Sequence, residues 1–166
     1  MSKRPRIKVP YQSIDIFFEL VTITLLILII GYTAYVYMSL PDTIPTHFNA
    51  KGEVDDYGQK ITVWLVPIIA LLMYVGLYII NLYPHMHNYM VNITEENALK
   101  NYRFSTRVLR IVNLFTMAIL AVVSYAIISA AMGNDFSLGS WFLPTIIGSS
   151  ILLPVIVLLY YKSINK

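Results

Sequence analysis

The stretch LVTITLLILIIGYTAYVYM, residues 20–38, is a long apolar run without a charged residue near the N-terminus. A helix needs about 20 such residues to cross the hydrocarbon core of a bilayer, which is about 30 Å thick. The chain contains four runs of this kind, and we expect membrane-spanning helices over residues 14–38, 61–83, 108–132 and 141–161. The pattern predicts an all-α membrane protein, a four-helix transmembrane bundle that forms a single transmembrane domain over residues 1–166.

The composition also favours a membrane protein over a soluble domain. Hydrophobic residues make up 57% of the chain and charged residues only 13%, whereas about a quarter of the residues in soluble domains are charged. The chain has no cysteine, which excludes disulfides, thiol catalysis and cysteine metal sites. The net charge of +3 comes from basic residues that flank the apolar runs. We therefore expect the lipid bilayer, and no nucleic acid, as the partner of these runs.

The basic residues predict how the helices are oriented. Loops rich in lysine and arginine stay in the cytoplasm under the positive-inside rule. If both termini are cytoplasmic, ten of the twelve basic residues lie on that side of the membrane. These ten are Lys3, Arg4, Arg6, Lys8, Lys100, Arg103, Arg107, Arg110, Lys162 and Lys166. The expected topology is a multi-pass protein with cytoplasmic N- and C-termini.

A cytoplasmic loop over residues 84–107 is expected between the second and third apolar runs. Pro84 should end the second helix, because proline has no N–H to donate. Asn92 followed by Glu95 indicates a helix start, so one helix is predicted from about Ile93 to Met132. The pair of histidines in this loop, His85 and His87, has no cysteine or obvious carboxylate neighbour, and we predict neither a metal site nor a cofactor.

A few polar residues lie within the apolar runs or at their cytoplasmic ends. Ionisable groups at this depth are functional candidates, but Glu19 and the third-helix arginines also suit a structural ion pair. We expect Glu19 to contact Arg107 or Arg110, and Asp15, one turn earlier, to be solvated. Asparagines in a bundle usually bridge helices. The predicted intramembrane polar residues are Glu19, Asn81, Arg107, Arg110 and Asn113.

The densest polar motif is LPDTIPTHFNAKGEVDDYGQK, residues 40–60, in the loop expected on the outer face. Residues 46–56 predict a β-hairpin-like loop between the first two helices. Gly52 occupies the position where a three-residue hairpin loop needs a left-handed backbone. That register pairs Phe48 with Val54 on the face turned toward the membrane or the bundle.

The hairpin also brings together groups that can form a charge-assisted hydrogen bond. With the three-residue loop, His47 lies opposite Asp55. A two-residue loop at Lys51–Gly52 would instead place His47 opposite Asp56, so both partners remain open.

The motif resembles the outer-loop signature of the SdpI-like family of bacterial membrane proteins, L-P-D-x-I-P-x-H-F/W-N-x-x-G-x-x-D-x-Y/W-G/S-x-K. The residues that match it are Leu40, Pro41, Asp42, Ile44, Pro45, His47, Phe48, Asn49, Gly52, Asp55, Tyr57, Gly58 and Lys60. The resemblance implies a protein of the bacterial cytoplasmic (plasma) membrane, and the family's named role is immunity against a secreted killing peptide. Larger members of the family carry further spans that this chain lacks.

These observations lead to a hypothesis of a non-enzymatic immunity or signalling factor that recognises an extracellular antimicrobial peptide or other partner. Three alternatives remain open: a structural cap, a small transporter or transporter subunit, and a membrane hydrolase or metal-dependent enzyme that uses His47 and Asp55. We predict no catalytic residue, since no nucleophile or metal set accompanies that pair. A homo-oligomer and a cytoplasmic partner also remain open. The predicted binding residues are Asp42, Pro45, His47, Phe48, Asn49, Gly52, Asp55, Asp56, Tyr57 and Lys60.

Overall fold

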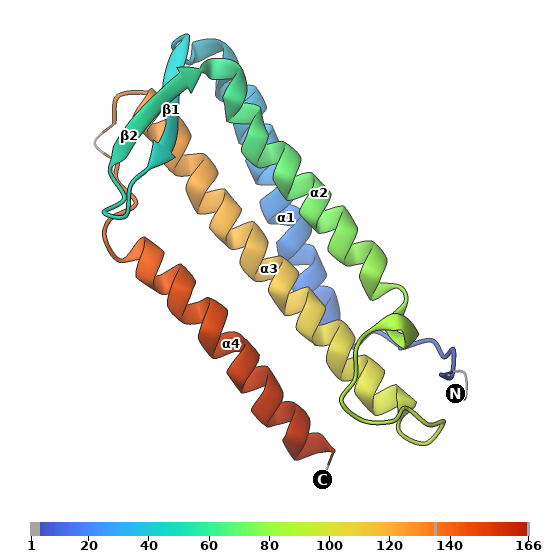
Figure 1. Ribbon diagram of the computed structural model, residues 1–166. Helices are drawn as coiled ribbons and strands as arrows, with labels where there is room; N and C mark the ends of the chain where they lie inside the picture. The colour runs from blue at the N-terminus through green and yellow to red at the C-terminus, as the bar shows by residue number, and fades with distance from the viewer. Residues whose placement is uncertain (1–3, 135, 166) are drawn as a thin grey trace.

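A computed structural model describes residues 4–134 and 136–165, so Lys3 and Lys166 lie outside the described residues. The main elements are α1 (Ser13–Val36), β1 (Thr43–Phe48), β2 (Val54–Gln59), α2 (Leu65–Asn81), α3 (Ala98–Ala131) and α4 (Phe142–Ile164) (Figure 1). Short 3-10 turns follow α1 (η1, Tyr37–Ser39), precede α2 (η2, Lys60–Trp64) and follow α2 (η3, Pro84–Met86).

Four helices in the described residues are long and apolar enough to cross a membrane. Three of them lie within a few residues of the apolar runs identified in the sequence. The chain therefore has the architecture of a multi-pass membrane protein, with a two-stranded hairpin between α1 and α2. The β-hairpin lies at one end of the helices, here called the hairpin end. The first described residues and the end of α4 lie at the other, here called the terminal end (Figure 1).

The start of α3 differs from the prediction. The helix begins at Ala98, with Asn97 as its N-cap, and not at Ile93 after Asn92. The side chain of Asn97 accepts a hydrogen bond from the Thr94 N–H at 2.9 Å and donates one to the carbonyl of Asn92 at 3.0 Å. These bonds stabilise a turn, and the short polar side chain of asparagine competes in this way with helix formation.

The expected four-helix bundle is wrong for α4. Helices α1, α2 and α3 pack against one another, whereas only Tyr161 of α4 is buried. Figure 1 shows α4 to one side of α3. The two helices meet at the terminal end, where the ring of Phe104 lies 5.6 Å from Tyr160 and 5.5 Å from Tyr161. Lipid is as apolar as the surface of α4, so no hydrophobic force drives this helix onto the others.

The apolar core of the three packed helices holds the hairpin in place. One buried cluster at the hairpin end joins the end of α1 to β1, η2 and α3. A second cluster lies further along the same three helices. The members of the first are Val36, Leu40, Ile44, Val63, Ile127 and Ile128, and those of the second are Leu26, Ile29, Ala70 and Met117.

Candidate functional site: the hairpin and the buried polar network

The hairpin loop has the predicted three-residue geometry. The N–H of Asn49 bonds to the carbonyl of Glu53 at 2.8 Å, and Phe48 pairs with Val54. Gly52 has a φ of +79°, a left-handed conformation that a residue with a Cβ adopts at a cost. The strands extend further than the predicted residues 46–56, because pairing continues to Thr43 and Gln59.

A β-bulge reconciles the two predicted partners of His47. The backbone of His47 pairs with Asp56, and the register is irregular on both sides of that pair. The side chain of His47 nevertheless contacts Asp55, with 2.5 Å between Nδ1 and Oδ1. A bulge re-aims side chains in this way. The predicted contact of His47 with a neighbouring acid is therefore confirmed, and Asp55 is the partner.

The inner face of the hairpin anchors it to the helices. Ile44 is 0% exposed and Pro45 is also buried. Phe48 is half-buried and packs against the apolar cluster at the hairpin end. The apolar residues of the motif thus account for its attachment to the bundle.

The polar residues of the motif lie on the exposed face. The side chain of Asp42 is 97% exposed, that of His47 64% and that of Asp55 41%. Asp56 and Tyr57 are exposed as well. Lys60 lies 3.4 Å from the carboxylate of Asp42, an ion pair that closes the base of the hairpin. These side chains remain accessible to a partner.

The tip of the hairpin docks on the loop that precedes α4. The carbonyl of Gly52 accepts hydrogen bonds from the Leu138 N–H at 3.1 Å and from Ser137 Oγ at 2.7 Å. A cavity of about 330 Å³, here called the hairpin cavity, lies beside this contact. His47, Asn49 and the start of α4 line it. The hairpin cavity thus places polar groups next to apolar residues of α4.

Comparison with known proteins points to the same segment. A family model described as "Domain of unknown function (DUF1648)" matches residues 24–71. The hairpin lies at the centre of this match. An uncharacterized protein of the archaeon Archaeoglobus fulgidus is 27% identical over 121 residues, which cover 64% of this chain and 66% of the relative. No solved structure matches the chain.

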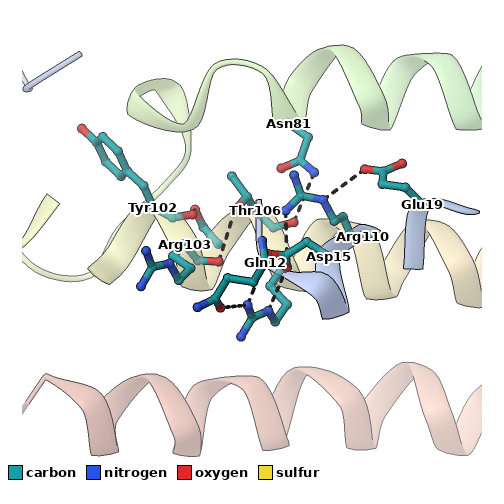
Figure 2. A network of polar contacts seen from close by, with 10 residues as sticks. Gln12, Asp15, Glu19, Asn81, Tyr102, Arg103, Thr106 and Arg110 are labelled. Atoms are coloured by element: carbon teal, nitrogen blue, oxygen red, sulfur yellow. Dashed lines mark hydrogen bonds and ion pairs between the residues drawn. The ribbon is translucent and has the colours of Figure 1, made fainter. Parts of the chain in front are cut away.

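A second polar cluster lies at the terminal end, between α1, α2 and α3 (Figure 2). Asp15 is 2% exposed, so the expectation that it is solvated is wrong. Its carboxylate accepts a hydrogen bond from Arg107 Nε at 2.9 Å and lies 3.7 Å from Arg110 Nη1. Asp15 is buried because α3 places Arg107 and Arg110 against the first turn of α1. Two cations near a buried carboxylate compensate the cost of removing it from water.

Of the other polar residues predicted at this end, Glu19 and Asn81 make the expected contacts and Asn113 does not. Glu19 Oε1 lies 3.1 Å from Arg110 Nε, as predicted. Asn81 also bridges helices as predicted, because its Nδ2 donates to the carbonyl of Thr106 at 3.2 Å. Asn113 is buried, but within residues 4–134 and 136–165 its Oδ1 has no hydrogen-bond partner. The predicted bridge through Asn113 is therefore not found.

Gln12 is the member of this network that the sequence analysis missed. Its side chain accepts a hydrogen bond from Arg107, and its N–H donates to Asp15 Oδ2 at 2.9 Å. Gln12 is the N-cap of α1 and Asp15 occupies the third helical position, so the two form a capping box. The spacing Gln-x-x-Asp before an apolar run was the available signal. With two acids and two arginines, the network is formally neutral and suits a structural clamp.

Of the two histidines in the loop after α2, His87 has both ring nitrogens in contact with other protein groups. Its Nδ1 lies 3.0 Å from Ser105 Oγ and its Nε2 lies 3.0 Å from the carbonyl of Ile80. In the part of the chain that the structure describes, no group of three or more metal-ligating side chains is found. The hydroxyl of Tyr89 donates to the carbonyl of Pro84 at 2.7 Å, and burial raises the pKa of Tyr89 to about 12. This phenol therefore stays neutral at physiological pH.

Proposed function

We propose that the protein is a non-enzymatic membrane protein that recognises an extracellular partner through the exposed face of its hairpin, as an immunity or signalling factor. The observation that carries the proposal is the division of the motif between two faces. Buried residues such as Ile44 already attach the hairpin to the helices, so the exposed His47 and Asp55 are not needed for that task. Exposed polar residues held on a rigid scaffold are typical of recognition surfaces.

The charge of the hairpin favours a cationic partner. Residues 40–60 carry four carboxylates and two lysines. Such a surface attracts a positively charged peptide at short range, within a screening length of about 8 Å at physiological salt. The hairpin cavity offers Phe142 and Leu143 next to His47, whose ring contacts Asp55. A peptide that is both cationic and amphipathic would contact both kinds of group.

The resemblance of the motif to the SdpI-like signature supports the same role. It extends from Leu40 to Lys60 and lies within the matched domain of unknown function. On this proposal, the protein resides in the cytoplasmic membrane with the hairpin outside and both termini in the cytoplasm. The distribution of lysine and arginine supports that orientation.

The polar network at the terminal end supports a structural role over a transport role. A proton relay needs an ionisable group that is free to exchange its proton. Glu19 is instead hydrogen-bonded to Arg110, and Asp15 to Arg107. This arrangement favours the binding function of the hairpin over the transporter alternative.

Cysteine labelling tests the orientation on which the function depends. A reagent that cannot cross membranes should label Ala50→Cys in intact cells, because Ala50 is exposed at the hairpin tip. It should label Ser163→Cys, near the end of α4, only after the cells are opened. Labelling of Ser163→Cys in intact cells would contradict the proposed topology.

A protection assay tests the function. The chain is expressed in a sensitive bacterium, which is then challenged with secreted cationic peptides. For each peptide against which the chain protects the cells, binding of the peptide to the purified protein is measured. We expect His47→Ala and Asp55→Ala to reduce both protection and peptide binding. Glu95→Gln is the matched control, because it removes an exposed carboxylate from the loop at the terminal end. Protection that survives both hairpin substitutions would exclude the hairpin from the mechanism.

A further inference from the structure

A cavity of about 430 Å³ lies between α3 and α4 toward the terminal end, and we call it the α3–α4 groove. Three of its wall residues on α3 are cations, namely Lys100, Arg103 and Arg107. Figure 2 shows Arg103 on the side of α3 that faces α4. None of the proposed roles of the hairpin uses this groove, which lies at the opposite end of the helices.

The groove is cationic at one end and apolar along the rest of its length. Residues 100, 103 and 107 share one face of α3, since residues three or four positions apart lie above one another on a helix. The next residue on that face is Ile111, and α4 contributes Ile156 and Val157 to the opposite wall. An occupant that fits must therefore carry an anionic group at the terminal end and an apolar chain toward the middle of the helices.

Two of the cations have no neutralising partner among the residues that the structure describes. Within residues 4–134 and 136–165, no carboxylate lies within ion-pair distance of Lys100 or Arg103. The Nε of Arg103 is buried and has no hydrogen-bond partner among those residues. A phosphate in the groove cannot reach this buried atom, but it can accept hydrogen bonds from the other guanidinium N–H groups of Arg103, which lines the groove. Arg107, in contrast, is already bound to Asp15.

We propose that the α3–α4 groove binds an anionic phospholipid. The phosphate accepts hydrogen bonds from Arg103 and Lys100, and an acyl chain lies along Ile111, Ile156 and Val157. The surrounding bilayer would supply this occupant, because α4 is largely unburied and the groove lies between two helices that are long and apolar enough to cross a membrane. Basic pockets between transmembrane helices are recognised sites for anionic headgroups. The bound lipid also fills the space between α4 and the three packed helices.

Native mass spectrometry tests the proposal with the purified full chain. The protein in detergent micelles is titrated separately with phosphatidylglycerol and with phosphatidylcholine of the same chain length, and the retained lipid is counted. We expect the double substitution Lys100→Gln/Arg103→Gln to weaken phosphatidylglycerol binding by about fivefold for each lost charge. Lys162→Gln is the matched control, because Lys162 is exposed on α4 at the same end without lining the groove. This control should bind like the wild type.

A second variant tests the apolar part of the groove separately from its charge. Ile156→Trp fills the space assigned to the acyl chain and should weaken binding although all cations remain. Equal retention of phosphatidylcholine and phosphatidylglycerol by the wild type would overturn the proposal. Undiminished binding by the double variant would do the same. If Lys162→Gln weakens phosphatidylglycerol binding as much as the double substitution does, the lipid is attracted to the basic surface in general and not to the groove. If Ile156→Trp leaves binding unchanged, the position assigned to the acyl chain is refuted.

Discussion

Replacing Asp15 by asparagine should destabilise the protein strongly. The substitution preserves the size of the side chain and removes its negative charge. In the native protein, the carboxylate of Asp15 lies 2.9 Å from Arg107 Nε and 3.7 Å from Arg110 Nη1. Because Asp15 is 2% exposed, water cannot replace the lost charge.

The size of the effect follows from the contacts that remain. Removing one partner of a buried ion pair costs about 3–5 kcal/mol, since the other charge stays buried and uncompensated. Here Arg107 keeps its bond to Gln12 and Arg110 keeps its bond to Glu19. We therefore expect Asp15→Asn to lower the free energy of unfolding by about 3 kcal/mol, the lower end of that range.

The assay is equilibrium unfolding of the purified protein in mixed micelles, in which denaturing detergent is increased stepwise. Glu95→Gln, at an exposed position in the loop before α3, should change the free energy of unfolding by less than about 0.5 kcal/mol. A double-mutant cycle with Arg107→Gln should give a coupling of about 1–3 kcal/mol. A loss below about 1 kcal/mol for Asp15→Asn, as for a surface pair, would refute the structural role of this network.

Three further outcomes are expected. Gly52→Ala should cost about 2 kcal/mol or more of stability, because the φ of Gly52 is +79° and a Cβ would lie 2.4 Å from the backbone N of Gly139. The control is Gly76→Ala, since no atom lies near the Cβ added there. The loop before α4 should be cut faster by a protease in the Gly52 variant alone. The pKa of Tyr89 rises from about 10 to about 12 on folding, so the folded state holds this proton more tightly and stability should fall as pH increases from 10 to 12. Tyr89→Phe should reduce the loss of unfolding free energy between pH 10 and 12. If the variant shows the same pH profile as the wild type, the role of Tyr89 is refuted. Asn113→Leu should leave stability unchanged or raise it by about 1 kcal/mol, because a buried oxygen without a partner is removed; a clear loss in thermal unfolding would show that Asn113 has a partner.

Local patterns in the chain were enough to predict α1, α2 and α4 to within a few residues, as well as the turn of the hairpin. A run such as residues 20–38 indicates a spanning helix because every backbone group of a helix is satisfied within the segment. Gly52 indicated the hairpin loop because its left-handed backbone is a property of one residue and its neighbours. A contact of Glu19 with Arg107 or Arg110 followed from matching depths along two helices, and the structure selects Arg110.

Features that depend on how distant segments meet required the tertiary structure. The bulge that directs His47 to Asp55 and the burial of Asp15 both arise where separate elements pack against each other. The position of α4 beside the other helices is a similar case, because its apolar surface suits lipid on every side and gives no direction of packing. The sequence thus determined which segments are helices and where their charges lie, since these follow from local residues. Only the tertiary structure decided which charges are neutralised and which face a groove, because those properties depend on contacts between segments far apart in the chain.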